Sequence, residues 1–79
     1  MNVLLFARAK DLIGRDRIDV ALADQATVGD LRRRLMTQYP AIAGLLEKSA
    51  FAVNDEFADD ATPIPHGAEI ALLPPVSGG

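Results

Sequence analysis

One amphipathic helical pattern, set between segments with strand-like patterns, most constrains how these 79 residues fold. Thr27-Val28-Gly29-Asp30 has the form of a capping box, in which the first and fourth side chains each bond the other residue's backbone amide. Apolar residues then recur at helical spacing: Val28, Leu31, Leu35 and Tyr39. Because the residue before a proline avoids the helical region, the helix should end before Pro40. The sequence therefore predicts one main helix with a single apolar face.

Two strand patterns precede this helix. Val3–Phe6 is continuously apolar, which is typical of a strand in the middle of a sheet. Leu12–Asp16 has the composition of a turn, and from Arg17 to Leu22 apolar and polar residues alternate as in a half-buried strand. We expect the two strands to form a hairpin.

Further strand patterns follow the helix. A short second helical turn is expected over Ile42–Lys48. Asn54-Asp55 then separates two short apolar runs, and both residue types tolerate the left-handed backbone of a tight hairpin. After a turn at His66-Gly67, a last strand is expected. The strands predicted in this half are Phe51–Val53, Glu56–Ala58 and Ala68–Leu73.

The order of these elements predicts an α+β fold, a mixed sheet with one main helix packed on one face. This order is the one that a ubiquitin-like β-grasp requires. We expect a single β-grasp domain over residues 1–73, followed by a flexible C-terminal Gly-Gly tail over residues 74–79. A chain of this size buries only about 60% of its unfolded surface, so it has room for one core and no large internal cavity. A self-contained enzyme pocket is not expected.

Composition excludes several classes of function. The chain has no cysteine and only one histidine, His66, so we expect no disulfide, no thiolate metal site and no metal held by paired imidazoles. A net charge of -3 provides no basic surface for nucleic acid. No apolar run approaches the roughly 20 residues of a membrane-spanning helix, so we expect a cytoplasmic protein without a membrane partner.

The chain ends in Leu73-Pro74-Pro75-Val76-Ser77-Gly78-Gly79. Pro74 and Pro75 favour an extended backbone, so the tail should project from the fold. Gly78 and Gly79 have no Cβ, which allows this end to enter a narrow slot and present its carboxylate to another protein. A carboxylate must first be activated, for example as an acyl-adenylate. Because the chain has no phosphate-binding glycine loop, we expect it to bind no cofactor and a partner to supply the ATP.

This ending resembles that of the small subunits of molybdopterin synthase. Thiamine-pathway sulfur carriers share the Gly-Gly but usually lack the Pro-Pro-Val before it. The resemblance continues through most of the chain in the same order, in Phe6–Gly14, Thr27-Val28 with Leu31 and Leu35, Ala52–Asn54, Gly67–Ala71 and Pro74–Gly79.

The resemblance implies a sulfur carrier. An adenylating enzyme of the ubiquitin-activating type would convert the Gly79 carboxylate to an acyl-adenylate, and sulfur would then replace the adenylate to give a thiocarboxylate. The tail would enter the large synthase subunit and donate sulfur to a cyclic pyranopterin, building the dithiolene that holds molybdenum. The catalytic Lys and Arg residues would lie on that large subunit, and the complex would be a heterotetramer.

The resemblance also implies where partners dock. Apolar residues near the tail and on the exposed sheet serve this purpose in the family, and the matching positions here are Phe6 and Leu73. Leu73 replaces the aromatic residue that many members have before the two prolines, so it offers less contact area. Lys10 stands where Arg is common, and an ammonium group cannot reproduce a bidentate guanidinium contact.

Three alternatives stay open. A ubiquitin-like modifier would be activated in the same way but would end in an isopeptide bond to a lysine. A thiamine-type sulfur carrier would use the same Gly-Gly end for a different recipient. A binding module would have its tail captured by backbone amides without chemistry.

Other polar and aromatic residues have simpler structural interpretations. We interpret Arg32-Arg33-Arg34 as the solvated face of the helix rather than a landing patch for a partner. Asp59-Asp60 should be exposed loop acids rather than a cation site, and His66 a turn residue. Three aromatic residues have the spacing of core residues and should pack rather than bind a ligand: Tyr39, Phe51 and Phe57.

Overall fold

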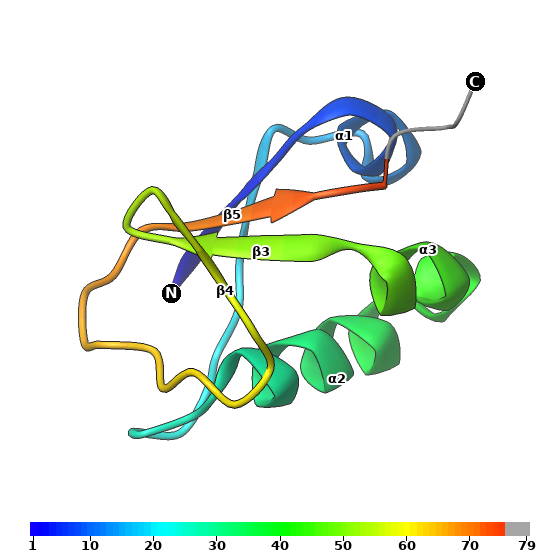
Figure 1. Ribbon diagram of the computed structural model, residues 1–79. Coiled ribbons are helices and arrows are strands. Elements are labelled where there is room, and N and C mark those ends of the chain that lie inside the picture. Colours follow the sequence, from blue (N-terminus) through cyan, green and yellow to red (C-terminus); the bar gives the residue numbers. More distant parts are fainter. Residues whose placement is uncertain (76–79) are drawn as a thin grey trace.

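A computed structural model, which describes residues 1–75, contains one five-stranded mixed sheet (Figure 1). The strands lie in the order β2-β1-β5-β3-β4, with β1 and β5 parallel and all other neighbours antiparallel. The expected α+β β-grasp architecture is confirmed. The strands are β1 (Asn2–Leu5), β2 (Arg17–Asp19), β3 (Ala50–Val53), β4 (Glu56–Ala58) and β5 (Ile70–Leu73).

The main helix, α2 (Val28–Gln38), begins and ends as the sequence predicts. The Thr27 amide donates to Asp30 Oδ2 at 2.9 Å, and the Asp30 amide donates to Thr27 Oγ1 at 3.2 Å, which completes the capping box. The helix stops two residues before Pro40. A 3-10 turn, η1 (Pro40–Ile42), then leads into a second helix, α3 (Ala43–Lys48), in the segment where a short helical turn was expected.

A third helix, α1 (Ala7–Ile13), was not predicted and overlaps the expected turn at residues 12–16. Its Ala9 is buried in the core, and Ile13 packs against the core one turn later. Gly14 ends the helix with a φ of 82° and donates its amide to the Lys10 carbonyl at 2.8 Å. Because glycine adopts this left-handed conformation more readily than any other residue, Gly14 is the sequence signal for a helix end rather than for a simple hairpin turn.

Strand ends differ from the prediction by a few residues. The first strand ends at Leu5 rather than Phe6, and the second at Asp19 rather than Leu22, although Val20 is buried and Leu22 still packs on the core. The tight hairpin between β3 and β4 is confirmed. Asn54 and Asp55 have positive φ angles of 50° and 67°, the left-handed conformation that favoured these residue types.

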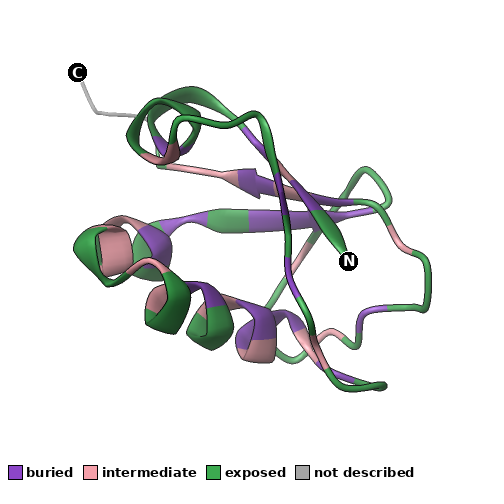
Figure 2. Cartoon of the chain, turned by 180° about the vertical axis from the view of Figure 1, so that it is seen from behind, coloured by how far each residue is buried: buried purple, intermediate pink, exposed green. Residues whose placement is uncertain are grey.

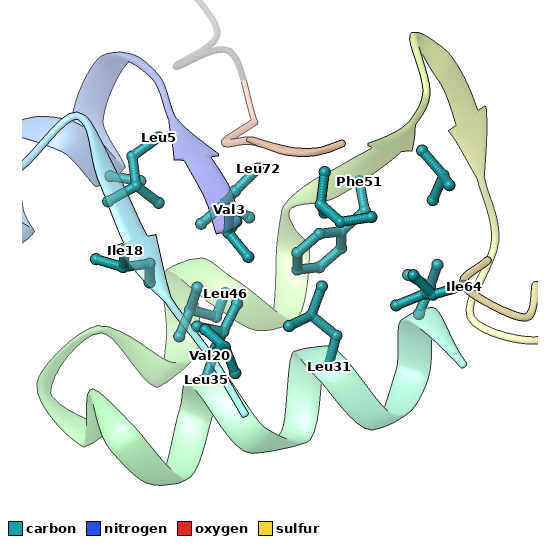
Figure 3. Packing of buried hydrophobic residues seen from close by; sticks show 14 residues of the cluster. Val3, Leu5, Ile18, Val20, Leu31, Leu35, Leu46, Phe51, Ile64 and Leu72 are labelled. Carbon is teal, nitrogen blue, oxygen red and sulfur yellow. The ribbon is translucent and has the colours of Figure 1, made fainter. Parts of the chain in front are cut away.

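The core lies between the sheet and α2, with α3 closing one end (Figures 1 and 3). Figure 2 shows the buried residues of α2 along its sheet-facing side. Leu31 and Leu35 of α2 and Leu46 of α3 point toward the sheet residues. The buried sheet residues that they meet are Val3, Leu5, Ile18, Phe51, Val53, Ile70 and Leu72.

Among the aromatic residues predicted to pack, Phe51 is fully buried and Tyr39 packs against the core. The prediction for Phe57 is wrong, because its side chain is 79% exposed. Phe57 lies on the edge strand β4 opposite Ala52, and the alternation of the strand points both away from the helices. Hydrophobicity alone could not show which side of this short strand faces the core.

Among residues 1–75, no helix is long and apolar enough to cross a membrane. The same residues contain no cluster of three or more His, Cys, Asp or Glu side chains that could hold a metal ion. His66 is an exposed turn residue, as predicted, beside Gly67 with a φ of 76°.

Candidate functional site

The expected reactive tail begins where the described residues end. β5 finishes at Leu73, and Pro74 and Pro75 follow it. The remaining predicted tail residues, Val76, Ser77, Gly78 and Gly79, lie outside the described residues. We call Leu73–Pro75 the root of the tail. The structure locates this root, while the reactive role of Gly79 stays a prediction.

The two predicted docking residues lie together at this root. β1 and β5 run parallel, and Leu5 is paired with Leu72, so Phe6 and Leu73 are the next residues at the same end of neighbouring strands. The Phe6 backbone is still extended before α1 begins, and its side chain is 45% exposed. Leu73 is half-buried. Their docking role stays a prediction, but the fold brings both beside the start of the tail.

An apolar row continues from this root across the face of the sheet that points away from the core. The register pairs Leu4 with Ala71, Ala71 with Ala52, and Ala52 with Phe57. The buried residues of α1, α2 and α3 belong to the core on the other face of the sheet. None of these three helices therefore packs against the apolar row. We call Leu4, Ala52, Phe57, Ala71 and Leu73 the open face; Phe57 is exposed, Leu4, Ala71 and Leu73 are half-buried, and Ala52 is 8% exposed.

Phe57 is the open-face residue for which the sequence pattern wrongly predicts a core position. Its signal was present in the pattern Glu56-Phe57-Ala58, where strict alternation allows either Phe57 or its two neighbours to face inward. Phe51 pairs with Ala58, so the buried Phe51 fixes the inward side as that of Ala58. An exposed aromatic side chain on a sheet face next to other apolar residues is typical of an interaction surface.

The arginine run on α2 is not uniformly solvated. Arg33 and Arg34 are exposed, as predicted, and Arg33 Nη2 donates to Asp30 Oδ1 at 2.6 Å. For Arg32 the prediction is wrong, because its side chain is only 15% exposed and pairs with Asp60 at 2.9 Å. Arg32 lies on the side of α2 that faces α3 and the start of β3. There its guanidinium group donates hydrogen bonds to backbone carbonyls and to the Asp60 carboxylate.

The loop acids stabilise the start of α2. Asp59 Oδ1 accepts hydrogen bonds from the Ala61 amide and from Thr62 Oγ1, both at 3.0 Å. The Asp60 carbonyl accepts the Gly29 amide at 2.9 Å, which satisfies one of the free amides at the helix start. Asp59 and Asp60 are exposed, as predicted, and both have structural partners.

Electrostatics at the helix start favour the ionised form of Asp30. The hydrogen bond from the Thr27 amide, together with those from Arg33 and the Thr27 hydroxyl, lowers the pKa of Asp30 below its ordinary value. The positive end of the helix dipole acts in the same direction. The capping box is therefore strongest when Asp30 is charged.

A surface hollow of about 1050 Å³ lies away from the tail. It is lined by two loops, residues 20–26 and 63–68, and by Met1. Met1 and the second loop precede the parallel strands β1 and β5, whereas the tail leaves from the opposite end of β5. The hollow therefore does not belong to the tail site.

Residues 3–79 match the ThiS family, a match that includes the tail. The chain belongs to this family. One relative is a protein of Dictyostelium discoideum described as a molybdopterin synthase sulfur carrier subunit. It is 45% identical to this chain over 81 residues, and the alignment covers 99% of this chain and 94% of the relative. The relative of the same description in Escherichia coli K12 is 40% identical, with 100% and 99% coverage of this chain and of the relative. Within the ThiS family, the chain belongs with the sulfur carrier subunits of molybdopterin synthase, which act in molybdenum cofactor biosynthesis.

Solved structures agree with the fold. Small archaeal modifier protein 1 of Haloferax volcanii has a TM-score of 0.81, 29% identity and 95% coverage of both chains. A complex of subunits 1 and 2 of the molybdopterin-converting factor from Helicobacter pylori contains a chain with a TM-score of 0.66 and 28% identity. That match covers 99% of this chain and 96% of the other. The ThiS-family fold is thus found both in a modifier and in a two-subunit complex.

Proposed function

We propose that this ThiS-family chain carries sulfur as a thiocarboxylate on Gly79. A carboxylate oxygen of Gly79 attacks the α-phosphorus of ATP in a partner enzyme, and pyrophosphate leaves. Hydrosulfide released by a sulfur-donating partner then attacks the acyl carbon, the acyl–oxygen bond to AMP breaks, AMP leaves with that oxygen, and the proton of the hydrosulfide passes to solvent. The resulting thiocarboxylate sulfur attacks a carbon of a cyclic pyranopterin in the large synthase subunit and displaces an oxygen substituent there. Water then cleaves the acyl–sulfur bond and regenerates the Gly79 carboxylate, and two such deliveries form the dithiolene.

The observation that carries this proposal is the family match through residue 79, taken together with the root of the tail. Leu73 is held by pairing with Ala50 in β3, and β5 lies in the middle of the sheet. The tail therefore begins from one of the most firmly held strands. Pro74 and Pro75 follow directly, and fixed φ angles there limit the directions in which the tail can leave.

The open face, with Phe6, supports docking to a protein partner. Phe6 is 45% exposed and Phe57 is 79% exposed. Although Ala52 is only 8% exposed, the small side chains of Ala52 and Ala71 allow close approach between the strands and a partner. Aromatic side chains in such positions supply most of the binding energy in many interfaces. We propose that the large synthase subunit and the adenylating enzyme use this same surface in turn, and that the complex with the large subunit is a heterotetramer.

The experiment that tests the proposal is the intact mass of the protein purified from its own host under conditions that preserve acyl-sulfur bonds. A C-terminal fragment in which sulfur replaces one oxygen of Gly79 is expected. A plain carboxylate in sulfur-replete cells would contradict the carrier function and favour a binding module without tail chemistry.

Similarity to small archaeal modifier protein 1 favours a second candidate function, a ubiquitin-like modifier. In that case Gly79 would form an isopeptide bond with a target lysine, and the same mass measurement would find a lysine adduct. A thiamine-type carrier would show the thiocarboxylate, but removing the protein would abolish thiamine rather than the molybdenum cofactor.

A further inference from the structure

Arg32 has more polar contacts than any other side chain among the described hydrogen bonds. Its Nη1 donates to the Leu46 carbonyl at 2.6 Å, to the Ser49 carbonyl at 2.7 Å and to the Glu47 carbonyl at 3.2 Å. On its other side, Nη2 donates to Asp60 Oδ1 at 2.9 Å. Nε also faces the Asp60 carboxylate, at 3.2 and 3.3 Å from its two oxygens.

The position of this guanidinium group is chemically specific. Its carbon lies 5.0 Å from the centre of the Phe51 ring, within the range of a cation–π contact. The carbonyls that it binds come from the last turn of α3 and the residue after it, where the helix dipole favours a positive charge. The planar guanidinium group can donate hydrogen bonds to these carbonyls and to the Asp60 carboxylate at the same time. The ammonium group of a lysine is a single point charge and cannot reproduce this arrangement.

The contacts of Arg32 lead directly to the root of the tail. Ser49, whose carbonyl Arg32 binds, is itself buried and donates its hydroxyl to the Leu45 carbonyl at 2.7 Å. The next residue, Ala50, begins β3 and pairs with Leu73, the last residue of β5. The residue that Arg32 contacts, Ser49, is thus the direct neighbour in sequence of the strand pair at which the tail begins.

We propose that Arg32 is a positioning residue for sulfur transfer. By holding the turn between α3 and β3, it fixes Ala50 and so the pairing and direction of Leu73, from which Pro74 and the tail continue. This inference rests on the proposed function, because the tail matters only if Gly79 is the reacting residue. Arg32 itself touches no reacting atom.

The test compares Arg32→Lys with Arg34→Lys, the same change two residues along the same helix at an exposed position. Amide hydrogen exchange is measured in the full chain without a partner. In Arg32→Lys we expect exchange at residues 50–51 and 72–73 to rise about tenfold relative to residues 2–4 and 17–19, since hydrogen bonds from a charged group hold the turn. Arg34→Lys should leave all four segments unchanged.

A second readout is the adenylation of Gly79 by the activating enzyme. Arg32→Lys is expected to raise KM about fivefold with kcat within about twofold of the wild type, because a less directed tail enters the enzyme less often but reacts normally once bound. Arg34→Lys should match the wild type in both constants.

Each contrary result overturns the inference. A uniform rise in exchange over all strands would mean that Arg32 contributes only overall stability, and unchanged exchange and KM would mean that it does not position the tail. If Arg32→Lys does not fold, Asp60→Asn replaces it, because Asp60 is 56% exposed and its loss frees only one side of the guanidinium group. A smaller rise confined to residues 50–51 and 72–73 is then expected, and no rise overturns the inference. If the wild type carries no thiocarboxylate, the proposed function fails, whereas the exchange result is independent of it.

Discussion

The two faces of the sheet differ in how they are used. The helix-facing side buries Phe51, Leu31 and Leu35 completely, and Arg32 joins α2 to α3 through the Leu46 carbonyl and to the neighbouring loop through Asp60. The open face has apolar side chains that no described helix covers, including Phe57, which is 79% exposed. The difference indicates that one face supplies stability while the other stays available to partners, so changes on the two faces should have separable effects.

The largest separation is expected at the tail. Deleting Gly79 should abolish thiocarboxylate formation, because no acyl carbon remains at the position that the activating enzyme reaches. The free energy of unfolding should change by less than about 0.5 kcal/mol, because a glycine has no side chain whose burial could be lost. Mass spectrometry after incubation with the activating enzyme, and urea denaturation, measure the two effects.

Gly78→Val provides a second variant with the same expected outcome, because a β-branched side chain blocks a narrow slot and stiffens the backbone. Loss of folding in either variant, or sulfur transfer at the wild-type rate, would contradict the separation between tail and core.

Phe51 and Phe57 allow the same comparison within one hairpin. Phe51→Ala should destabilise the protein by about 3–5 kcal/mol, because it empties a fully buried site. Phe57→Ala should change stability by less than about 0.5 kcal/mol but weaken binding to the large subunit by about tenfold or more, as expected for an aromatic contact residue. Urea denaturation and calorimetric titration with the large subunit measure these changes. Equal loss of stability in both variants would refute the assignment of two distinct faces.

Much of the helix-facing side could be predicted from the sequence. The capping box, the helical spacing of Leu31 and Leu35, and the proline that follows are local signals, and each was confirmed. The hairpin turn at Asn54-Asp55 was equally local, because the residue types themselves favour the left-handed backbone. Such signals need no knowledge of what the segment packs against.

The parts that could not be predicted depend on tertiary pairing. The direction of Phe57 was fixed only by the register of β3 against β4, and the burial of Arg32 only by the approach of α3 to α2. Phe6 and Leu73 are distant in sequence and meet only because β1 and β5 are parallel neighbours. A docking role for these two residues is implied by the family resemblance and not by their spacing in the sequence.

Gly29 and Gly44 differ in the space around the position that a Cβ atom would take. A Cβ at Gly29 would lie 3.1 Å from the Asp60 carbonyl oxygen, and that oxygen accepts the Gly29 amide. Gly29→Ala should therefore destabilise the protein by about 1 kcal/mol, the crowding of the loop exceeding the helix-propensity gain. Gly44, inside α3, has no atom within 4 Å of its Cβ position, so Gly44→Ala should stabilise by about 0.5–1 kcal/mol. Thermal denaturation distinguishes the two signs, and a stabilising Gly29→Ala would show that the loop moves freely.

The smallest expected effect is the pH dependence of the capping box. Hydrogen bonds from Thr27 and Arg33 lower the pKa of Asp30 in the folded state, so the unfolded state binds its proton more readily. The contribution of Asp30 is therefore present above the ordinary pKa of an aspartate and is lost as the pH falls through the folded-state value. We expect the stability difference between the wild type and Asp30→Asn to be largest near neutral pH and to shrink between about pH 5 and pH 2. Asp24→Asn, a change at an exposed loop residue, serves as the control in the same urea titrations. A difference for Asp30→Asn that stays constant over this range would mean that the charge of Asp30 adds nothing to the stability of the start of α2.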